Sequence, residues 1–170
     1  MLIQTKLELI KITNKEIPTV QNLAREIWEE HYIKILSQEQ INYMLDLFYS
    51  TNKIQSEIEE GISWEMLLDE DKPIGYLVCK IESEKLYISK IYLKAETRGK
   101  GLGKFLLNRA IELAKQNDKT SIYLNVNKYN TDSISFYERN GFMKIDEGVF
   151  DIGNGYVMDD FILELILFNS

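Results

Sequence analysis

Cysteine, histidine and long apolar runs are scarce in this chain of 170 residues, and each shortage excludes a class of protein. One cysteine, Cys79, excludes an internal disulfide. One histidine, His31, excludes a histidine-rich metal cluster, so we predict no bound metal. No run of about eighteen apolar residues is present to span a membrane, and the first residues lack the pattern of a signal peptide. We therefore expect a cytoplasmic protein with no membrane partner.

Basic residues are also in the minority. The sequence has 27 Asp plus Glu against 20 Lys plus Arg, which gives a net charge of −7. Nucleic-acid-binding proteins usually show the reverse balance, so we predict no nucleic acid partner. An acidic surface favours a cationic substrate, although an acidic surface without any such role has the same composition. The chain is 45% hydrophobic, enough for a sizeable core, and its length fits one domain over residues 1–170.

Helical and extended patterns alternate along the chain. Capping residues followed by apolar residues three or four positions apart predict helices. Apolar runs bounded by turn residues predict strands. The order of these elements predicts an α/β fold with a mixed sheet, antiparallel at the start, and a right-handed β-α-β unit near residues 85–127. The predicted strands cover residues 7–12, 63–69, 74–82, 85–93, 121–127, 142–146 and 156–167, and the predicted helices cover 17–32, 37–48, 51–60, 105–116 and 131–140.

A glycine-rich turn, Arg98 to Lys104, joins the strand that ends at Leu93 to the helix that starts at Phe105. The first amides of a helix lack intrahelical acceptors and carry partial positive charge, and glycine lets an anion approach them closely. We therefore predict a pyrophosphate site. A dinucleotide motif would need a further glycine at Leu106, and a P-loop would need Ser or Thr at Phe105. The spacing that remains is R-x-x-G-x-G.

A second motif follows, from Asn130 to Phe142, and reads N-x-x-S-x-x-x-Y-x-x-x-G-F. In order and at this separation, the two motifs resemble those of the GNAT family of N-acetyltransferases. The resemblance covers roughly residues 86–142. It implies the GNAT fold, a mostly antiparallel sheet with flanking helices and a central pair of parallel strands that splay apart. It also implies acetyl-CoA as co-substrate, bound in the cleft between those strands.

The resemblance further implies which residues act. The backbone amides of residues 98–104 would bind the pyrophosphate, the strand end at residues 91–93 would meet the acetyl and pantetheine groups, and Asn130 and Ser133 would approach from the other wall. Tyr137 matches the family position of the general acid that protonates the leaving thiolate. The implied cofactor-binding residues are Ile91, Tyr92, Leu93, Arg98, Gly99, Lys100, Gly101, Leu102, Gly103, Lys104, Asn130, Ser133 and Tyr137.

The general base is not identified by the sequence. Some members of the family carry a glutamate on the central strand where this chain has Ser89, and a serine cannot act as a base unaided. An ordered water or another carboxylate would then take the proton. Glu29, Glu30 and Glu84 are candidates, but each is also explained as a solvated surface charge.

The acceptor site is expected from the first two helices and the last hairpin. Trp28, Glu29 and Tyr32 combine aromatic rings with a carboxylate, which suits an ammonium group. An amphipathic helix with a buried tryptophan explains the same residues. Ser89 completes the predicted substrate-binding set, and the last hairpin can add Tyr156, Met158, Asp159 and Asp160. The layout most resembles the PaiA-type branch of the family, which acetylates polyamines.

We therefore predict an enzyme that moves an acetyl group from acetyl-CoA to a primary amine of a small cationic acceptor, by direct attack in a ternary complex. Two alternatives stay open: acetylation of proteins or peptides, and a CoA-binding sensor without catalysis. We also predict that the last strand can support a homodimer by edge pairing.

Overall fold

The computed structural model describes residues 6–168. The contacts of the chain form two compact units, and each is described by itself. Within the described residues, unit 1 comprises residues 6–79 and 90–108, and unit 2 comprises residues 80–89 and 109–168. The single domain expected over residues 1–170 stays a prediction, and its ends, residues 1–5 and 169–170, lie outside the described residues.

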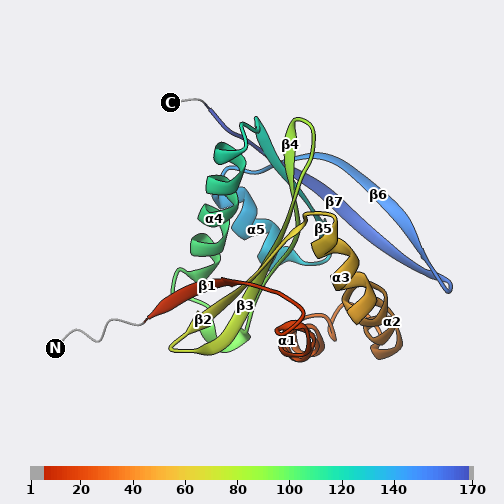
Figure 1. Cartoon of the computed structure of the whole chain (residues 1–170). Helices are drawn as coiled ribbons and strands as arrows, with labels where there is room; N and C mark the ends of the chain where they lie inside the picture. Colours follow the sequence, from red (N-terminus) through yellow and green to blue (C-terminus); the bar gives the residue numbers. More distant parts are fainter. Residues whose placement is uncertain (1–5, 169–170) are drawn as a thin grey trace. The chain divides into compact units, whose positions relative to one another are not determined.

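The helices and strands occur in the predicted order (Figure 1). One short 3-10 helix, η1, is added between β4 and α4. Most bounds agree with the sequence pattern within one or two residues. The elements are β1 (Leu7–Lys11), α1 (Ile17–His31), α2 (Gln38–Tyr49), α3 (Thr51–Glu59), β2 (Ser63–Asp69), β3 (Lys72–Ile81), β4 (Lys85–Leu93), η1 (Ala95–Thr97), α4 (Leu102–Gln116), β5 (Ser121–Asn127), α5 (Thr131–Arg139), β6 (Met143–Gly153) and β7 (Tyr156–Ile166).

Within the described residues, unit 1 contains an antiparallel sheet, helices α1 to α3, η1 and the first part of α4. β2 pairs with β1 on one side and with β3 on the other, both antiparallel, and the second pairing shifts its register between Leu67 and Leu68. Helix α1 has an apolar stripe at helical spacing, which is why it packs as a helix with that face buried. The buried residues of this stripe are Ile17, Val20, Leu23, Ala24, Ile27 and Trp28.

Unit 2 contains the parallel pair. β4 and β5 run parallel from Lys85↔Ser121 to Ile88↔Leu124, whereas β5–β7 and β6–β7 are antiparallel. Hydrogen-bonded neighbours follow the order β1-β2-β3-β4-β5-β7-β6, with β3 and β4 each contributing residues to both units. The predicted α/β fold, with a mostly antiparallel sheet and one parallel pair, is therefore confirmed.

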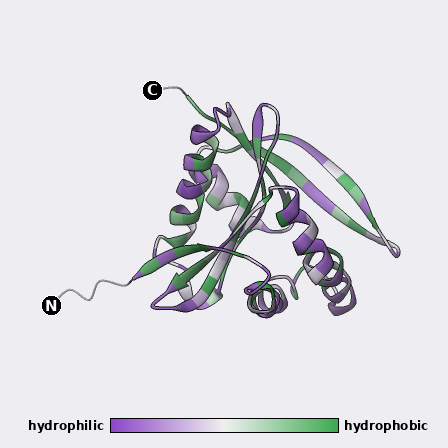
Figure 2. Cartoon of the chain, viewed as in Figure 1, coloured by the Kyte–Doolittle hydropathy of each residue, from purple (hydrophilic) through white to green (hydrophobic). Residues whose placement is uncertain are grey.

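The hairpin of β6 and β7 is longer than the sequence indicates. β6 continues to Gly153 although its predicted strand ends at residue 146. Its polar residues break the apolar pattern, and pairing with β7, rather than burial, holds the strand. Hydrophobic and hydrophilic residues are interspersed along both strands (Figure 2). β6 is an edge strand, and Met143 and Val149 on it are 72% and 65% exposed.

The single cysteine lies where the sequence places it. Cys79 is on β3 and is 1% exposed, as expected for a strand residue in an apolar run. Among residues 6–168, no helix is both long enough and apolar enough to cross a membrane.

Candidate active site

The turn before α4 has a backbone shaped for an anion. Gly99 and Gly101 have φ angles of +80° and +78°, a region that glycine enters without steric cost. A Cβ added to either would meet nothing within 4 Å, so the backbone is accessible on that side. The carbonyl of Gly101 accepts the first helical hydrogen bond, from the amide of Phe105 at 3.1 Å. The amides of Leu102 and Gly103 therefore lie in the first turn, where the helix supplies no acceptor.

Positive side chains surround this turn. Arg98, Lys100 and Lys104 are exposed, and each adds formal charge to the partial charge of the helix start. The guanidinium of Arg98 lies 3.4 Å from Nδ1 of His31, the last residue of α1. This contact links the glycine turn to the helix that carries the predicted acceptor residues.

The strand end next to the turn is fixed by a close approach of β3. Ile91, Tyr92 and Leu93 are half-buried at the end of β4. A Cβ on Gly75 of β3 would lie 2.5 Å from the carbonyl oxygen of Tyr92 and 2.7 Å from a methyl carbon of Leu93. Only glycine fits there. Gly75 is not among the predicted site residues, although an isolated glycine inside a strand pattern signals such an approach.

Five aromatic side chains of unit 1 form one cluster: Trp28, Tyr32, Tyr49, Tyr76 and Tyr92. The Trp28 ring lies 4.8 Å from that of Tyr32 and 5.7 Å from that of Tyr92. Two pairs of hydroxyls share hydrogen bonds, Tyr32 with Tyr92 at 2.9 Å and Tyr49 with Tyr76 at 2.7 Å. Burial raises the pKa of Tyr49 and of Tyr76 well above the ordinary value, so both phenols stay protonated.

Trp28 and Tyr32 have different positions in this cluster. Trp28 is 4% exposed, so its indole packs in the core as the amphipathic-helix interpretation expects. Tyr32 is half-buried and reaches the strand end through the hydroxyl of Tyr92. Of the two rings, that of Tyr32 is the more accessible, and Trp28 packs against it.

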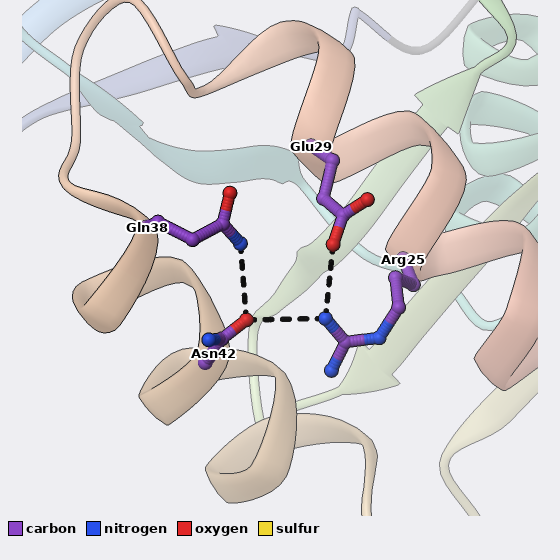
Figure 3. A network of polar contacts seen from close by, with 4 residues as sticks. All are labelled: Arg25, Glu29, Gln38 and Asn42. Atoms are coloured by element: carbon purple, nitrogen blue, oxygen red, sulfur yellow. Dashed lines mark hydrogen bonds and ion pairs between the residues drawn. The ribbon is translucent and has the colours of Figure 1, made fainter.

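Glu29 is engaged in a polar network between α1 and α2 (Figure 3). Its carboxylate accepts a hydrogen bond from Arg25 at 3.1 Å, and the same Arg25 nitrogen donates to Asn42 at 3.1 Å. Gln38 also donates to Asn42. The side chain of Glu29 is 44% exposed. The geometry therefore favours the interpretation of Glu29 as a surface charge that joins two helices.

A buried lysine is a second residue of this region that the sequence pattern did not identify. Lys90 on β4 is 8% exposed, and its ammonium lies 5.0, 5.3 and 5.9 Å from the ring centres of Trp64, Tyr49 and Phe48. Burial lowers the pKa of Lys90 to about 8, and the charge of Glu57 opposes that shift. Its alternation with Ile88 and Tyr92 along the strand was the available signal, because a charge at that position faces inward.

Unit 2 carries the second motif on one short helix. Asn130 is 6% exposed and precedes α5, but its side chain makes no capping hydrogen bond, unlike an ordinary helix-entry asparagine. Ser133 is half-buried one turn before Tyr137. Tyr137 is 7% exposed, with its ring 5.4 Å from Phe136 and 5.5 Å from Phe142. Ser133 and Tyr137 share a helix face because they are four residues apart.

The predicted site residues thus fall in both units. Unit 1 holds residues 91–93 and 98–104 together with Trp28, Glu29 and Tyr32, whereas Ser89, Asn130, Ser133 and Tyr137 belong to unit 2. Chemically, unit 1 offers an anion cradle beside an aromatic cluster, and unit 2 offers a buried phenol as a proton donor. In the part of the chain that the structure describes, no three potential metal ligands gather.

Comparison with known proteins gives consistent matches. The acetyltransferase (GNAT) family matches residues 18–142. The chain is 30% identical to a spermidine N(1)-acetyltransferase of Thermoplasma acidophilum, over 90% of this chain and 96% of that protein. It is 28% identical to the peptidyl-lysine N-acetyltransferase YjaB of Salmonella typhimurium, over 64% of this chain and 74% of that protein.

A solved structure agrees with these matches. It is that of the PaiA N-acetyltransferase from Thermoplasma acidophilum in complex with coenzyme A, with a TM-score of 0.83 and 29% identity. The alignment covers 95% of this chain and 99% of that one. The two motifs, the sheet with its one parallel pair and these matches lead to one conclusion. The chain belongs to the GNAT family and is an acetyl-CoA-dependent N-acetyltransferase.

Proposed function

We propose that the acceptor is a small cationic amine of the polyamine type. The observation that carries this proposal is the 30% identity to a spermidine N(1)-acetyltransferase over 90% of the chain. The net charge of −7 supports it, because an acidic protein attracts a polycation at long range. The aromatic cluster around Tyr32 adds ring faces that favour an ammonium group.

In this proposal the turn before α4 binds the donor. The amides of residues 98–104 hold the pyrophosphate of acetyl-CoA, and Arg98, Lys100 and Lys104 neutralise its charge. The strand end at residues 91–93 meets the pantetheine and acetyl groups, where a backbone amide polarises the thioester carbonyl. The open backbone at Gly99 and Gly101 supports this role, because a side chain there would keep a phosphate away.

Tyr137 is the proposed general acid. The amine attacks the thioester carbon, the C–N bond forms, the C–S bond breaks, and the departing sulfur takes the phenolic proton. A reference pKa of about 10 for tyrosine against about 8.5 for a thiol makes this transfer slightly uphill but feasible. Asn130 and Ser133 would contact the coenzyme arm. The burial of Tyr137 between two phenylalanine rings supports a fixed orientation of its hydroxyl.

Tyr32 and Ser89 remain the predicted acceptor-contacting residues. Trp28 is a positioning residue in this proposal, since its indole packs against the rings of Tyr32 and Tyr92. Glu29 would act only through long-range attraction, because Arg25 already pairs with it.

Acetylation of lysine side chains in peptides is the second candidate function. It is favoured by the match to a peptidyl-lysine N-acetyltransferase, which is lower in identity, at 28%, and covers 64% of the chain. Both candidate substrates present a primary ammonium on a flexible chain. They differ in what that chain is attached to, which is a further amine in a polyamine and a peptide backbone in a protein.

The test is an acceptor panel with purified protein and acetyl-CoA. Release of free thiol is followed with spermidine, spermine, amino acids, aminoglycosides and lysine-containing peptides, and products are identified by mass spectrometry. Preference for polyamines supports the first function, and preference for peptides supports the second. Thiol release that is the same with and without every amine would overturn both.

Tyr137→Phe tests the mechanism. A general acid contributes about 10²-fold or more, so turnover should fall by that factor while the affinity for acetyl-CoA stays unchanged. Phe136→Leu is the matched control, because it alters the neighbouring ring and leaves the phenol in place. Turnover of Tyr137→Phe within a few-fold of the original enzyme would remove Tyr137 from the mechanism.

The last strand, β7, is paired on both sides, with β5 and with β6, so the prediction that it offers a free edge is wrong. We propose instead that the outer edge of β6 supports a homodimer. β6 is an edge strand with exposed apolar side chains at Met143, Ile145 and Val149. Light scattering would give the mass in solution, and Val149→Lys should shift a dimer toward the monomer.

A further inference from the structure

The ladder of β5 is longer on one side than on the other. Toward β4 the pairing ends at Ile88↔Leu124, whereas toward β7 it continues to Asn127↔Asp160. Within residues 6–168, no ladder pair joins β4 to the last three residues of β5. Asp160 on β7 lies directly across from Asn127, the final residue of β5.

Asp160 is buried between two strands. It is 3% exposed, it pairs with Asn127 on β5, and it pairs with Gly148 on β6. Side chains of paired residues point to the same face of a sheet, so Asn127 and Asp160 share a face. Gly148 contributes no side chain there, but a Cβ on it would lie 3.0 Å from the ring of Phe150. The ring therefore lies over Gly148, on the face of the sheet where the carboxyl group of Asp160 is.

One carboxylate oxygen of Asp160 is unsatisfied. Its Oδ2 is buried and makes no hydrogen bond, while the side chain of Asn125 bonds the carboxyl group and favours its charged form. Burial is the larger effect and raises the pKa of Asp160 to about 6. A buried oxygen without a donor costs about 1–3 kcal/mol. The described residues supply no ion-pair partner to offset that cost.

The surrounding charges do not neutralise Asp160 either. Asp159, the preceding residue, raises its pKa and forms its own ion pair with Lys128. Farther along β7, Glu164 is paired with Lys85. β6 carries three acidic residues, Asp146, Glu147 and Asp151, and one cation, Lys144, which is already paired with Glu147. A positively charged N–H donor from outside the chain would satisfy the free oxygen and neutralise the carboxylate.

We propose that Asp160 is a catalytic residue that binds the ammonium form of the acceptor and accepts its proton. The inference rests on the proposed transfer of acetyl to an amine. The ammonium gives one proton to Oδ2, which leaves a neutral amine and a protonated Asp160. The amine attacks the thioester, the thiolate takes the proton of Tyr137, and the second N–H proton restores that phenol. Asp160 then releases its proton to solvent, so the reaction frees one proton per acetylation.

This assignment supplies the base that the sequence lacks. Ser89 cannot take a proton, and Glu29 is exposed and paired with Arg25. Asp160 combines burial, an unsatisfied oxygen and a place opposite Asn127, the last residue of β5. Its neighbour Asp159 lacks these features, because alternation along the strand points it the other way and Lys128 neutralises it.

The experiment compares Asp160→Asn with Asp159→Asn, using spermidine and acetyl-CoA from about pH 5 to pH 9. In the original enzyme, kcat/KM for spermidine should fall on the acidic side near pH 6, where Asp160 becomes protonated. Asp160→Asn should lose about 10²-fold in kcat/KM and should no longer show that acidic limb. Asp159→Asn should keep the acidic limb. Affinity for acetyl-CoA, measured by calorimetry, should be unchanged in all three.

Two outcomes overturn the inference. One is an Asp160→Asn enzyme that retains the limb, and the other is a rate within about three-fold of the original. If the original protein acetylates no amine at all, the proposed function fails together with the inference, and that result is read before any variant is made. If it acetylates amines and Asp160→Asn is unaffected, only the role of Asp160 fails.

A measurement on the unaltered protein keeps the test independent of how the variant folds. Spermidine is titrated into the complex with CoA, which cannot react. Its affinity should weaken as the pH falls through about 6, because protonated Asp160 no longer attracts an ammonium group. An affinity that is constant across this range would overturn the proposal.

Discussion

Lys90 in unit 1 and Asp160 in unit 2 are both ionisable side chains buried on strands, but their surroundings differ. Lys90 has three aromatic rings within 6 Å of its ammonium and the opposite charge of Glu57 nearby. Asp160 has one asparagine, a like charge in Asp159 and an oxygen without a donor. Burial moves both pKa values toward neutrality, to about 8 and about 6.

The contrast separates two uses of a buried charge. Lys90 is supplied with everything that a cation requires, so its surroundings explain it without any ligand. Asp160 lacks a hydrogen-bond donor for one of its oxygens, and this lowers the stability of the fold. Keeping such a group despite that cost points to a functional role. Removing a partner in unit 1 should therefore weaken the protein, whereas removing the charge in unit 2 should strengthen it.

Glu57→Gln removes the negative charge that stabilises the Lys90 ammonium in unit 1, and it should have the largest effect on stability. Glutamine keeps the acceptor for the indole N–H of Trp64, which donates to Oε1 of Glu57 at 3.2 Å, but it removes the charge. Removing an opposite charge near a buried ion costs about 1–3 kcal/mol, so the free energy of unfolding at pH 7 should fall by about that amount. Urea denaturation measures it.

The pH dependence and a control sharpen this prediction. Lys90 loses its proton near pH 8 in the folded state and near 10.5 when unfolded, so its contribution to stability rises between these values. The loss in Glu57→Gln should therefore shrink above pH 8. Lys53→Met removes the other cation near Glu57, at 3.8 Å and 49% exposed, and should cost less than about 1 kcal/mol. Equal losses in both variants would contradict the assignment.

Asp160→Asn removes the buried charge of unit 2, and it should raise the free energy of unfolding, whereas Glu57→Gln lowers it. Asp160 ionises near pH 3.8 in the unfolded chain and near 6 in the folded one, so its contribution to stability falls as the pH rises through this window. The variant should be more stable above pH 6, with a melting temperature higher by about 3 °C for each 1 kcal/mol gained. The gain should vanish below pH 3.8.

Asp159→Asn is the matched control for that melt. It removes an ion pair with Lys128 whose side chains are about one-third exposed. Such a pair contributes at most about 1 kcal/mol, so the control should be equal to or slightly less stable than the original protein. A stabilising Asp159→Asn together with a neutral Asp160→Asn would reverse the comparison.

The parts of the site that the sequence predicts are local ones. The turn at residues 98–104 and the helix that carries Tyr137 each depend on residues close together in the chain, so spacing alone identifies them. Gly99 and Gly101 show the positive φ angles that such a turn requires. The family, the fold and the co-substrate follow from these two motifs.

The residues whose surroundings and roles the sequence does not reveal depend on pairing between distant segments. The rings around Lys90 come from α2 and β2, which no periodicity connects to β4. Asp160 is one of 27 acidic residues, and only the register of β7 against β5 and β6 buries it while leaving Asp159 partly exposed. The same lack of a local signal hid the extension of β6 to Gly153.

Gly101→Ala and Gly155→Ala compare one turn from each unit, the turn before α4 and the turn between β6 and β7. Both glycines have φ near +80°, and neither has an atom within 4 Å of an added Cβ. Each variant should lose about 1 kcal/mol of stability from backbone strain alone. Only Gly101→Ala should also weaken acetyl-CoA binding, by about tenfold. The strained backbone would shift the amides of residues 98–104, which are proposed to bind the pyrophosphate. Calorimetry with acetyl-CoA measures this, and equal affinity in both variants would remove the turn before α4 from the donor site.

Tyr32→Phe should have the smallest effect on the free energy of unfolding. Together with a buried counterpart, it tests whether the half-buried tyrosine of unit 1 contacts the acceptor while the buried one serves stability. Tyr32 and Tyr92 share a hydrogen bond at 2.9 Å where both are half-buried. Water can replace the lost hydroxyl, so the free energy of unfolding should fall by only about 0.5 kcal/mol. Tyr49→Phe is the matched variant, since Tyr49 bonds Tyr76 at 2.7 Å in the core and would leave a buried hydroxyl without its partner. Urea denaturation should show the larger loss in Tyr49→Phe, and KM for spermidine should rise only in Tyr32→Phe. If KM rises in Tyr49→Phe instead, the acceptor lies deeper in the cluster than Tyr32.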